Sequence, residues 1–292
     1  MSGSEEAPWR APRNCVDRAL ASALNWRSTS LGVAGSEVGL WMCLAFGLEV
    51  AGVQLTSATK TAFLNQVSML ITPLLVYASG HEVRFVEWLA CGLGLLGSGL
   101  VAVDAMNSSG GEVDEEEVNA NSQMGTSSEM VGLLLIMASA FFFALATVRL
   151  GRYSMLFDSL KLSTASACSL GVVSVVWVLC SSLGTPGGLA KEVAVVRFLM
   201  LNSFTLMVLL WLGFGPGALA AYLQASGQKV VPAAQAQVIY STTPLWSAAF
   251  AMLVLDASDE AMGAVAWLGA AIMLGSSILV AISSQPGKSI HH

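Results

Sequence analysis

Glu49 is the residue of this sequence whose type and place most clearly suggest chemistry. It lies inside an apolar stretch, eight residues before Ser57. At about 1.5 Å per residue of helix, this separation places it on the order of 12 Å deep in a bilayer. An ionisable side chain at that depth is costly and is by default a functional candidate. Two roles stay open for Glu49: a part in a polar cavity that binds substrate or a proton, and a structural hydrogen bond.

Two sets of polar residues repeat one helical spacing in distant parts of the chain. The spacing i, i+3, i+7 places each set on one face of a helix. Such a face can line a cavity, or it can supply hydrogen bonds between helices, which average only about 0.6 kcal/mol in membranes. The first set is Asn65, Ser68 and Thr72, and the second is Tyr240, Thr243 and Ser247.

Several further polar or aromatic residues near these sets are second-rank candidates for the same cavity. They are Gln54, Gln66, Gln224, Gln235 and Trp246. Pro73 and Pro244 follow within the same two segments and are candidates for hinges, because proline has no amide hydrogen and bends a helix. Such bends also occur for packing alone.

The composition indicates what must position these residues. Of 292 residues, 55% are hydrophobic and only 11% are charged, whereas an ordinary soluble domain has roughly 25% charged residues. A soluble globular protein is therefore excluded. About 20 apolar residues suffice to cross a bilayer, and we expect an all-α membrane protein with eight transmembrane helices. The expected spans are 38–55, 61–79, 85–103, 130–148, 162–183, 198–226, 231–255 and 263–283.

Lys and Arg residues predict the orientation of these spans, because basic loops stay on the cytoplasmic side more often than not. Threading the chain through eight spans places three of them on one side, namely Lys60, Lys191 and Arg197. The other ten lie on the opposite side: Arg10, Arg13, Arg18, Arg27, Arg84, Arg149, Arg152, Lys161, Lys229 and Lys288. Both termini are therefore expected on the cytoplasmic or stromal side.

The sequence contains an internal repeat of opposite topology. The segment that begins at Ser57 superposes on the segment that begins at Pro232, and each is followed by a Trp-Leu pair and a helix rich in small residues. Lys60 and Lys229 precede the spans of the two copies and fall on opposite sides. Inverted repeats of this kind are typical of secondary transporters, whose substrate site lies near the bilayer midplane at the repeat interface.

The same residues carry a family resemblance. Gly52–Lys60, with Pro73–Leu75, resembles the first repeat of the EamA-type drug/metabolite transporter family. Ala218–Gln224 and Ile239–Trp246 resemble the second repeat, and the latter is similar to plant and algal plastid-type members. The resemblance extends from about residue 37 to residue 284.

This resemblance implies a ten-helix carrier built from two inverted five-helix repeats, with both ends cytoplasmic, that moves small organic metabolites. Glutamine is common in the family at the position of Glu49. That preference favours a polar cavity or a structural hydrogen bond over a proton carrier. In the family the first helix contributes to the central cavity.

The chain departs from the family pattern in its first repeat, which has three predicted spans where the second has five. The expected organisation is a polar N-terminal leader (1–36), a truncated first repeat (37–104), an acidic flexible linker (105–128), a second repeat (129–284) and a C-terminal tail (285–292). Two interpretations stay open: a truncated gene model or fragment, and a divergent form that is oligomeric or inactive.

Other kinds of chemistry are not expected. The five cysteines form no CxxC pair and the three histidines are scattered, so we expect no metal site and no cofactor. The stretch Gly92–Gly97 matches a nucleotide-binding pattern but lies within a predicted span with no preceding strand, so nucleotide binding is not expected. The predicted spans hold no paired carboxylates and no Ser/His pair, and we expect no enzyme. A net charge of −6 argues against nucleic acid.

The leading hypothesis is therefore a multi-pass membrane carrier of small organic metabolites that works by alternating access between inverted repeats. The alternative is a transport-inactive fragment or membrane scaffold that keeps the fold. The predicted spans contain no Lys or Arg, which argues against phosphate or carboxylate substrates. The lipid bilayer is the expected partner, a homo-oligomer stays open, and the plastid envelope is one candidate location.

Overall fold

The structure is a computed structural model that describes residues 30–56, 61, 64–108, 126–183, 188–243, 245–246 and 263–283. The regular secondary structure of this part of the chain is helical. Within these described ranges, six helical segments are long and apolar enough to cross a membrane: Leu31–Val53, Phe85–Asp104, Ser128–Leu156, Ser159–Leu183, Ser203–Gly227 and Ala264–Ser283. The chain is thus all-α and compatible with an integral multi-pass membrane protein.

The chain divides into two compact units. Unit 1 consists of Met1–Trp26, Ala45–Val148 and Pro232–His292, and unit 2 consists of Arg27–Leu44 and Arg149–Val231. Helices α2 (Leu31–Val53) and α7 (Thr126–Leu156) each contribute residues to both units.

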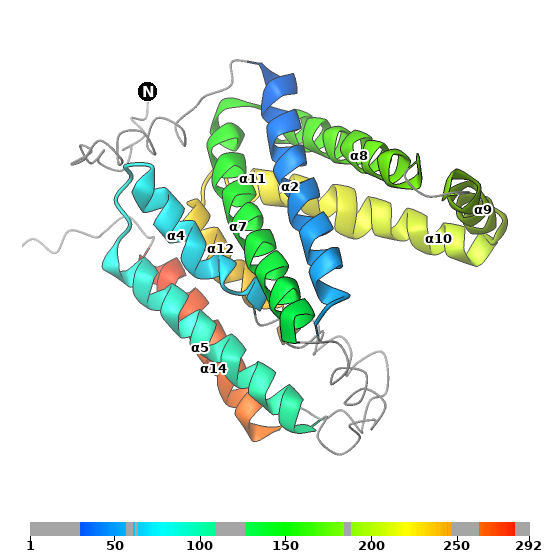
Figure 1. Cartoon of the computed structure of the whole chain (residues 1–292). Coiled ribbons are helices and arrows are strands. Elements are labelled where there is room, and N and C mark those ends of the chain that lie inside the picture. Colours follow the sequence, from blue (N-terminus) through cyan, green and yellow to red (C-terminus); the bar gives the residue numbers. More distant parts are fainter. Residues whose placement is uncertain are drawn as a thin grey trace, which may run out of the picture. The chain divides into compact units, whose positions relative to one another are not determined.

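In unit 1, helices α5 (Phe85–Ser108) and α14 (Ala264–Ser283) pack side by side in opposite directions (Figure 1). Their backbones approach closely at Gly97, where an added Cβ would lie 2.7 Å from the carbonyl oxygen of Gly269. Small residues are what permit such close helix contacts in membranes.

Opposite charges, one within α5 and one just before it, hold the two ends of α14. The Asp104 carboxylate accepts from the Gly263 amide at 2.8 Å, just before the first turn of α14. At the other end, Arg84 Nη1 donates to the carbonyl of Ser283 at 2.7 Å. An acid at the helix N-terminus and a base at the C-terminus both complement the helix dipole, so these contacts fix α14 against α5.

The unit 1 parts of α2 and α7 also pack on each other. The rings of Phe46 and Phe143 meet edge to face at 5.1 Å, an arrangement that aromatic pairs favour. The Ser139 hydroxyl donates to the carbonyl of Ala45 at 2.9 Å. An added Cβ at Gly52 would lie 2.6 Å from Ile136 Cγ1, so this helix pair also depends on a small residue.

Unit 2 has its own buried cluster, formed by Ala34, Val38, Leu150, Tyr153, Leu162 and Ala225. Helix α8 (Ser159–Leu183) packs closely against the start of α2, because an added Cβ at Gly39 would lie 2.6 Å from the carbonyl oxygen of Ser166. It also contacts α11 (Ala220–Gly227). The cluster thus ties the first half of α2 to the last turns of α7 and to α8.

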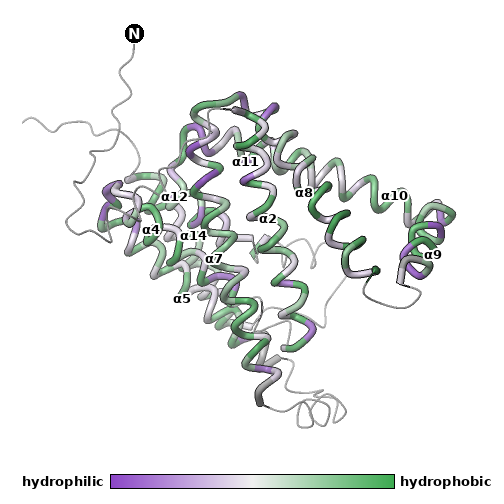
Figure 2. The backbone as a smooth tube through the Cα atoms, turned by 45° about the horizontal axis from the view of Figure 1, so that its top comes forward, coloured by the Kyte–Doolittle hydropathy of each residue, from purple (hydrophilic) through white to green (hydrophobic). Residues whose placement is uncertain are grey.

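Beyond this cluster, the helices of unit 2 are apolar and exposed. Helices α9 (Gly188–Leu201) and α10 (Ser203–Leu212) follow α8, and a π-helical segment, η2 (Gly213–Leu219), with Pro216 inside it, joins α10 to α11. Figure 2 shows long hydrophobic stretches along α8 and α10. No residue of the apolar window in Ser203–Gly227 is buried, which suits a surface that faces lipid.

Several predicted boundaries differ from the structure. The sequence predicts a leader that ends at residue 36, but α2 begins at Leu31, after Ser30 Oγ accepts from the Val33 amide at 3.4 Å. Hydropathy misses this start because a serine cap opens the helix before the apolar run. The linker expected at 105–128 is overlapped by α5 and α7, and residues 109–125 lie outside the described part of the chain.

The predicted span 198–226 begins too early. Asn202 separates α9 from α10, and its side-chain oxygen accepts from the amides of Phe204 and Thr205 at 3.2 and 3.3 Å. Its extended backbone and this N-cap end one helix and start the next. Lys191 and Arg197, expected in the link between two spans, lie within α9.

The count of eight spans is not confirmed. Six predicted spans correspond to the six long apolar segments. Within the predicted span 61–79 the described helix is α4 (Ser68–Ala78), of 11 residues, and within 231–255 it is α12 (Ala233–Tyr240), of eight residues. Residues 247–262 lie outside the described part of the chain.

Candidate functional site

The structure brings Glu49 and Asn65 together. The Asn65 side-chain amide, Nδ2, donates to Glu49 Oε1 at 2.9 Å. Glu49 lies near the end of α2, and Asn65 lies in the segment before α4, and both side chains are half-buried. The two first-rank candidates of the sequence thus form one pair in unit 1.

Asn65 stands at a break in its predicted helix. Gln66 and Val67 form a turn, and the Met69 amide donates to the carbonyl of Gln66, at 3.0 Å, instead of reaching Asn65 four residues earlier. The Val67 amide similarly donates to Leu64 at 3.0 Å. Hydrogen bonds over three residues are typical of a tightened 3₁₀ turn, so the span is discontinuous at this point.

The second repeat has the same break at the equivalent position. Ser241 and Thr242, which correspond to Gln66 and Val67 in the superposed repeats, also form a turn. Three backbone hydrogen bonds recur at equivalent positions with closely similar lengths. In the first repeat the amides of Val67, Leu70 and Ile71 donate to the carbonyls of Leu64, Val67 and Val67, at 3.0, 2.9 and 3.2 Å. In the second repeat the equivalent amides of Thr242, Leu245 and Trp246 donate to the carbonyls of Ile239, Thr242 and Thr242, at 3.1, 3.0 and 3.2 Å.

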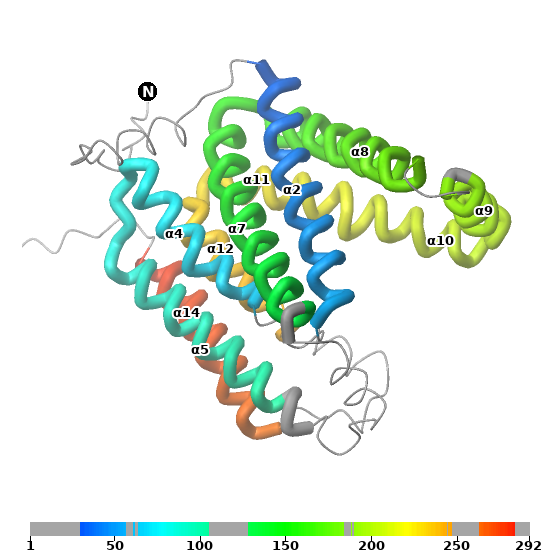
Figure 3. The backbone as a smooth tube through the Cα atoms, in the orientation of Figure 1, coloured from blue at the N-terminus to red at the C-terminus, as the bar shows by residue number. Residues whose placement is uncertain are grey.

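The two broken segments contact each other through a polar pair. Helices α4 and α12 lie side by side (Figure 3). Gln237 Nε2, on α12, donates to the Ser68 hydroxyl, at the start of α4, at 2.8 Å. Ser68 is one turn after Asn65, and residues at i and i+3 eclipse in a 3₁₀ turn. The Ser68–Gln237 pair therefore follows the Glu49–Asn65 pair along the same face of the break.

Three side-chain oxygens in this part of unit 1 are buried and have no hydrogen-bond partner among the described residues. They are Thr56 Oγ1, Asn65 Oδ1 and Gln237 Oε1. All three are able to accept hydrogen bonds or to ligate a cation. Such groups are rare in folded proteins and call for a physical explanation.

Other predicted candidates make local contacts. The buried Thr72 hydroxyl donates to the carbonyl of Ser68 at 2.8 Å, and Thr243 donates in the same way to Tyr240 at 2.6 Å. These two threonines thus serve the backbone of their own segments.

The remaining candidates are not brought to the Glu49–Asn65 pair by any described contact. Gln54, Thr243 and Trp246 are exposed, Gln66 and Tyr240 are half-buried, and Gln224 belongs to unit 2. Of the two predicted hinges, Pro73 is buried inside α4. Pro244 and Ser247 lie outside the described residues.

Gln235 forms a buried hydrogen bond with a glutamate of α5. Gln235 Nε2 donates to Glu87 Oε1 at 2.8 Å, and both residues are buried. Arg84 lies one turn before Glu87, with its Nε 3.9 Å from the same oxygen. The sequence identifies Gln235 only as a second-rank candidate. It does not identify Glu87, because this residue lies where a span is expected to begin.

A second missed cluster lies in unit 2. Arg149 Nε and the Tyr153 hydroxyl both donate to the carboxylate of Glu37, and Trp41 Nε1 contacts it at 3.4 Å. Arg149 is only 4% exposed, and its guanidinium lies 5.4 Å from the centre of the Tyr153 ring. The sequence predicts Arg149 in a link, after a span that ends at residue 148.

That expectation is wrong, because α7 continues to Leu156. A hydropathy criterion stops at the first arginine, whereas pairing with Glu37 neutralises the charge inside the helix. The premise that the spans contain no Lys or Arg therefore fails. The sequence does contain a spacing that could have identified this cluster. Glu37 is four residues before Trp41, and Arg149 is four residues before Tyr153, so each pair shares a helix face.

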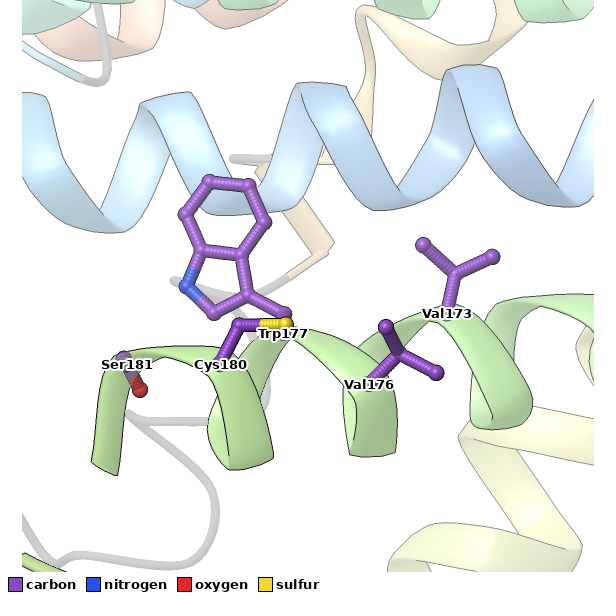
Figure 4. Close-up of a pocket in the computed structure, with 5 residues that line it drawn as sticks. All are labelled: Val173, Val176, Trp177, Cys180 and Ser181. Carbon is purple, nitrogen blue, oxygen red and sulfur yellow. The ribbon is translucent and has the colours of Figure 1, made fainter. Parts of the chain in front are cut away.

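A shallow groove on α8 offers no comparable site. Its lining residues, Val173, Val176, Trp177, Cys180 and Ser181, all belong to this one helix (Figure 4). A groove lined by a single helix is open and mostly apolar, so it lacks the convergent polar groups of a ligand pocket. Among the described residues, no group of three His, Cys, Asp or Glu side chains is placed to hold a metal ion.

Comparisons with known proteins show the fold alone. No family model and no curated protein matches the chain. Solved structures do match, and one of them, described only as "Crystal structure of protein", has a TM-score of 0.59 at 14% identity. The match covers 94% of this chain and 92% of that one. The arrangement of helices is therefore one that a solved structure shares.

Proposed function

We propose that this protein is a membrane carrier of small organic metabolites, built on the inverted-repeat fold of EamA-type transporters and working by alternating access. The observation that carries the proposal is the pair of equivalent helix breaks. Interrupted helices at corresponding positions of two repeats are the best pointer to a transporter's binding site. Here each break is accompanied by polar contacts, Glu49–Asn65 and Ser68–Gln237.

The orientation of the helices supports an inverted repeat. Helix α5 begins at Phe85, three residues before Trp88, and α14 begins at Ala264, three residues before Trp267. These equivalent helices run in opposite directions in unit 1 (Figure 1). A parallel duplication would give them the same direction, whereas an inverted duplication gives the observed one.

We extend the proposal to topology and location. Eight spans, with both termini on the cytoplasmic or stromal side, follow from the ten-to-three distribution of basic residues. The plastid envelope is the proposed membrane, on the likeness of residues 239–246 to plastid-type members. Fluorescent-protein fusions at each end, with protease protection, would test the topology.

The substrate class is small and organic, and the described site favours a molecule without a strong negative charge. Glu49 is an acid with an amide partner, and an anionic substrate would be repelled there. Arg149 does not reverse this preference, because Glu37 already compensates its charge in unit 2. We therefore expect neutral or cationic metabolites to be carried in preference to anions.

A counterflow assay tests the function. The full-length protein would be reconstituted into liposomes loaded with unlabelled metabolites, and entry of labelled neutral, cationic and anionic compounds would be followed. We expect saturable counterflow for a neutral or cationic class, and its loss in Asn65→Leu. Gly92→Ala is the matched control, since an added Cβ there has no neighbour within 4 Å. Absence of counterflow for the whole panel would favour the alternative, an inactive scaffold that keeps the fold.

A further inference from the structure

The oxygen atoms at the first helix break form a set that suits a positively charged ion. The Glu49 carboxylate brings one negative charge, and the buried oxygens of Asn65 and Gln237 have no donor among the described residues. Asn65 contacts Glu49 directly, and Gln237 contacts Ser68 one turn further along the same face. Buried acceptors that remain without a donor are unfavourable, and a bound cation would satisfy them.

Backbone carbonyl groups near these side-chain oxygens add further partial negative charge. Helix α2 ends at Val53, four residues after Glu49, with no basic residue in its last turn. The carbonyl groups at a helix C-terminus carry a partial negative charge. At the neighbouring break, the Met69 amide bonds to Gln66 and so does not occupy the Asn65 carbonyl. Helix C-terminal ends and unwound carbonyls are what coordinate sodium in transporters with broken helices.

The described part of unit 1 offers no basic side chain for Glu49. Its Lys and Arg content is the single residue Arg84, whose guanidinium donates to Ser283 and lies near Glu87. Among the described residues, an ionised Glu49 therefore has no counterpart of the compensation that Arg149 gives to Glu37. A half-buried carboxylate in an apolar helix is costly without such compensation.

The ligand types decide the kind of ion. Carboxylate and amide oxygens are hard ligands, which suit alkali and alkaline-earth cations and not soft metals. The set contains one carboxylate, so a divalent ion would keep an uncompensated charge in the membrane. We infer that the Glu49 carboxylate and the side-chain oxygens of Asn65 and Gln237 hold a monovalent metal cation of the sodium class. Its coupling to transport rests on the proposed carrier function, whereas the binding itself does not.

Equilibrium binding of radioactive sodium to the purified full-length protein in detergent tests this inference. N-methyl-D-glucamine chloride would keep the ionic strength constant. We expect saturable binding that unlabelled NaCl displaces, and at least about a tenfold loss of affinity in Glu49→Gln and Asn65→Leu. The matched control is Glu87→Gln, which removes another glutamate of unit 1 that is bonded to an amide, and it should bind as the wild type does.

A second readout keeps the test decisive if one variant folds poorly. NaCl should raise the melting temperature of the wild type and of Glu87→Gln, but not that of Gln237→Leu. Absence of saturable sodium binding overturns the inference, and so does an equal loss of sodium affinity in the Glu49 and Glu87 variants. A melting temperature that rises when the pH is lowered but not when NaCl is added would overturn it as well. Counterflow that proceeds without sodium would leave the carrier function standing and would overturn the coupling of this ion to transport, whereas sodium binding without counterflow would support the ion site and count against the carrier function.

Discussion

Helix α2 carries two glutamates with very different surroundings. Glu37 receives hydrogen bonds from the arginine and tyrosine of α7, in unit 2. Glu49, twelve residues or roughly 18 Å further along the helix, receives one from the amide of Asn65, in unit 1. The first charge is compensated by the protein, and the second is not compensated by any described residue. A buried acid with a fixed counter-charge suits a structural role, whereas one without it is available to bind something else.

Removal of Arg149 should give the largest effect. Arg149→Met leaves the Glu37 carboxylate, which is only 18% exposed, without its counter-charge, and breaking a buried pair from one side costs about 3–5 kcal/mol. We expect a large fall in melting temperature, measured by size-exclusion chromatography of heated samples. The double variant Glu37→Gln/Arg149→Met should recover most of it. Equal losses in the single and double variants would show that the pair is not what stabilises unit 2.

The same substitution at the two glutamates sharpens the comparison. Glu37→Gln leaves Arg149 without its counter-charge but keeps an oxygen that can accept from it, so it should cost about 3 kcal/mol, the lower end of that range. Glu49→Gln removes a charge that has no described counter-charge, and it should change stability by less than about 1 kcal/mol. Chemical denaturation of both variants in the same detergent measures the difference. An equal cost would mean that Glu49 has a fixed counter-charge too.

Glu87 gives an intermediate case, because a buried amide and a more distant arginine both contact it. Gln235→Leu removes the amide donor and should cost about 2 kcal/mol, the usual range for hydrogen bonds to charged groups. The melting temperature should fall less than in Arg149→Met. A fall in melting temperature as large as that of Arg149→Met would show that Gln235, and not Arg84, is the main stabiliser of the Glu87 charge.

Two glycine substitutions on α5 test the contribution of helix packing to stability without changing any charge. Gly97→Ala would place a Cβ 2.6 Å from Met273 Cγ and 2.7 Å from the Gly269 carbonyl oxygen, whereas Gly92→Ala meets nothing within 4 Å. We expect a loss of about 1–2 kcal/mol in the first variant, from overpacking of α5 against α14, and none in the second. Similar stability of both would show that the two helices separate easily.

Much of the fold is predictable because hydropathy alone locates long apolar helices. The spans around residues 85–103 and 263–283 agree with α5 and α14 within a few residues. Hydropathy fails where individual side chains set the boundary. Asn202 ends α9 by capping α10, and Arg149 continues α7 because Glu37 neutralises it.

The candidate site is only partly predictable. The place of Glu49 in an apolar stretch identifies that residue, and the internal repeat with its helical spacing identifies Asn65 and Ser68. The structure brings each of them into a polar pair. No residue type marks the places where both helices break, because the turns at Gln66–Val67 and Ser241–Thr242 contain neither glycine nor proline. Such breaks depend on tertiary contacts, and those partners are far apart in the sequence.

The central claim is that the paired breaks, with Glu49 and Asn65 at the first of them, form the site of transport. The most direct test compares counterflow of a carried metabolite by wild-type protein and by Glu49→Gln in liposomes, with melting temperatures measured on the same preparations. We expect Glu49→Gln to keep its melting temperature and to lose at least about tenfold in rate. A stable Glu49→Gln variant that transports at the wild-type rate would contradict the account.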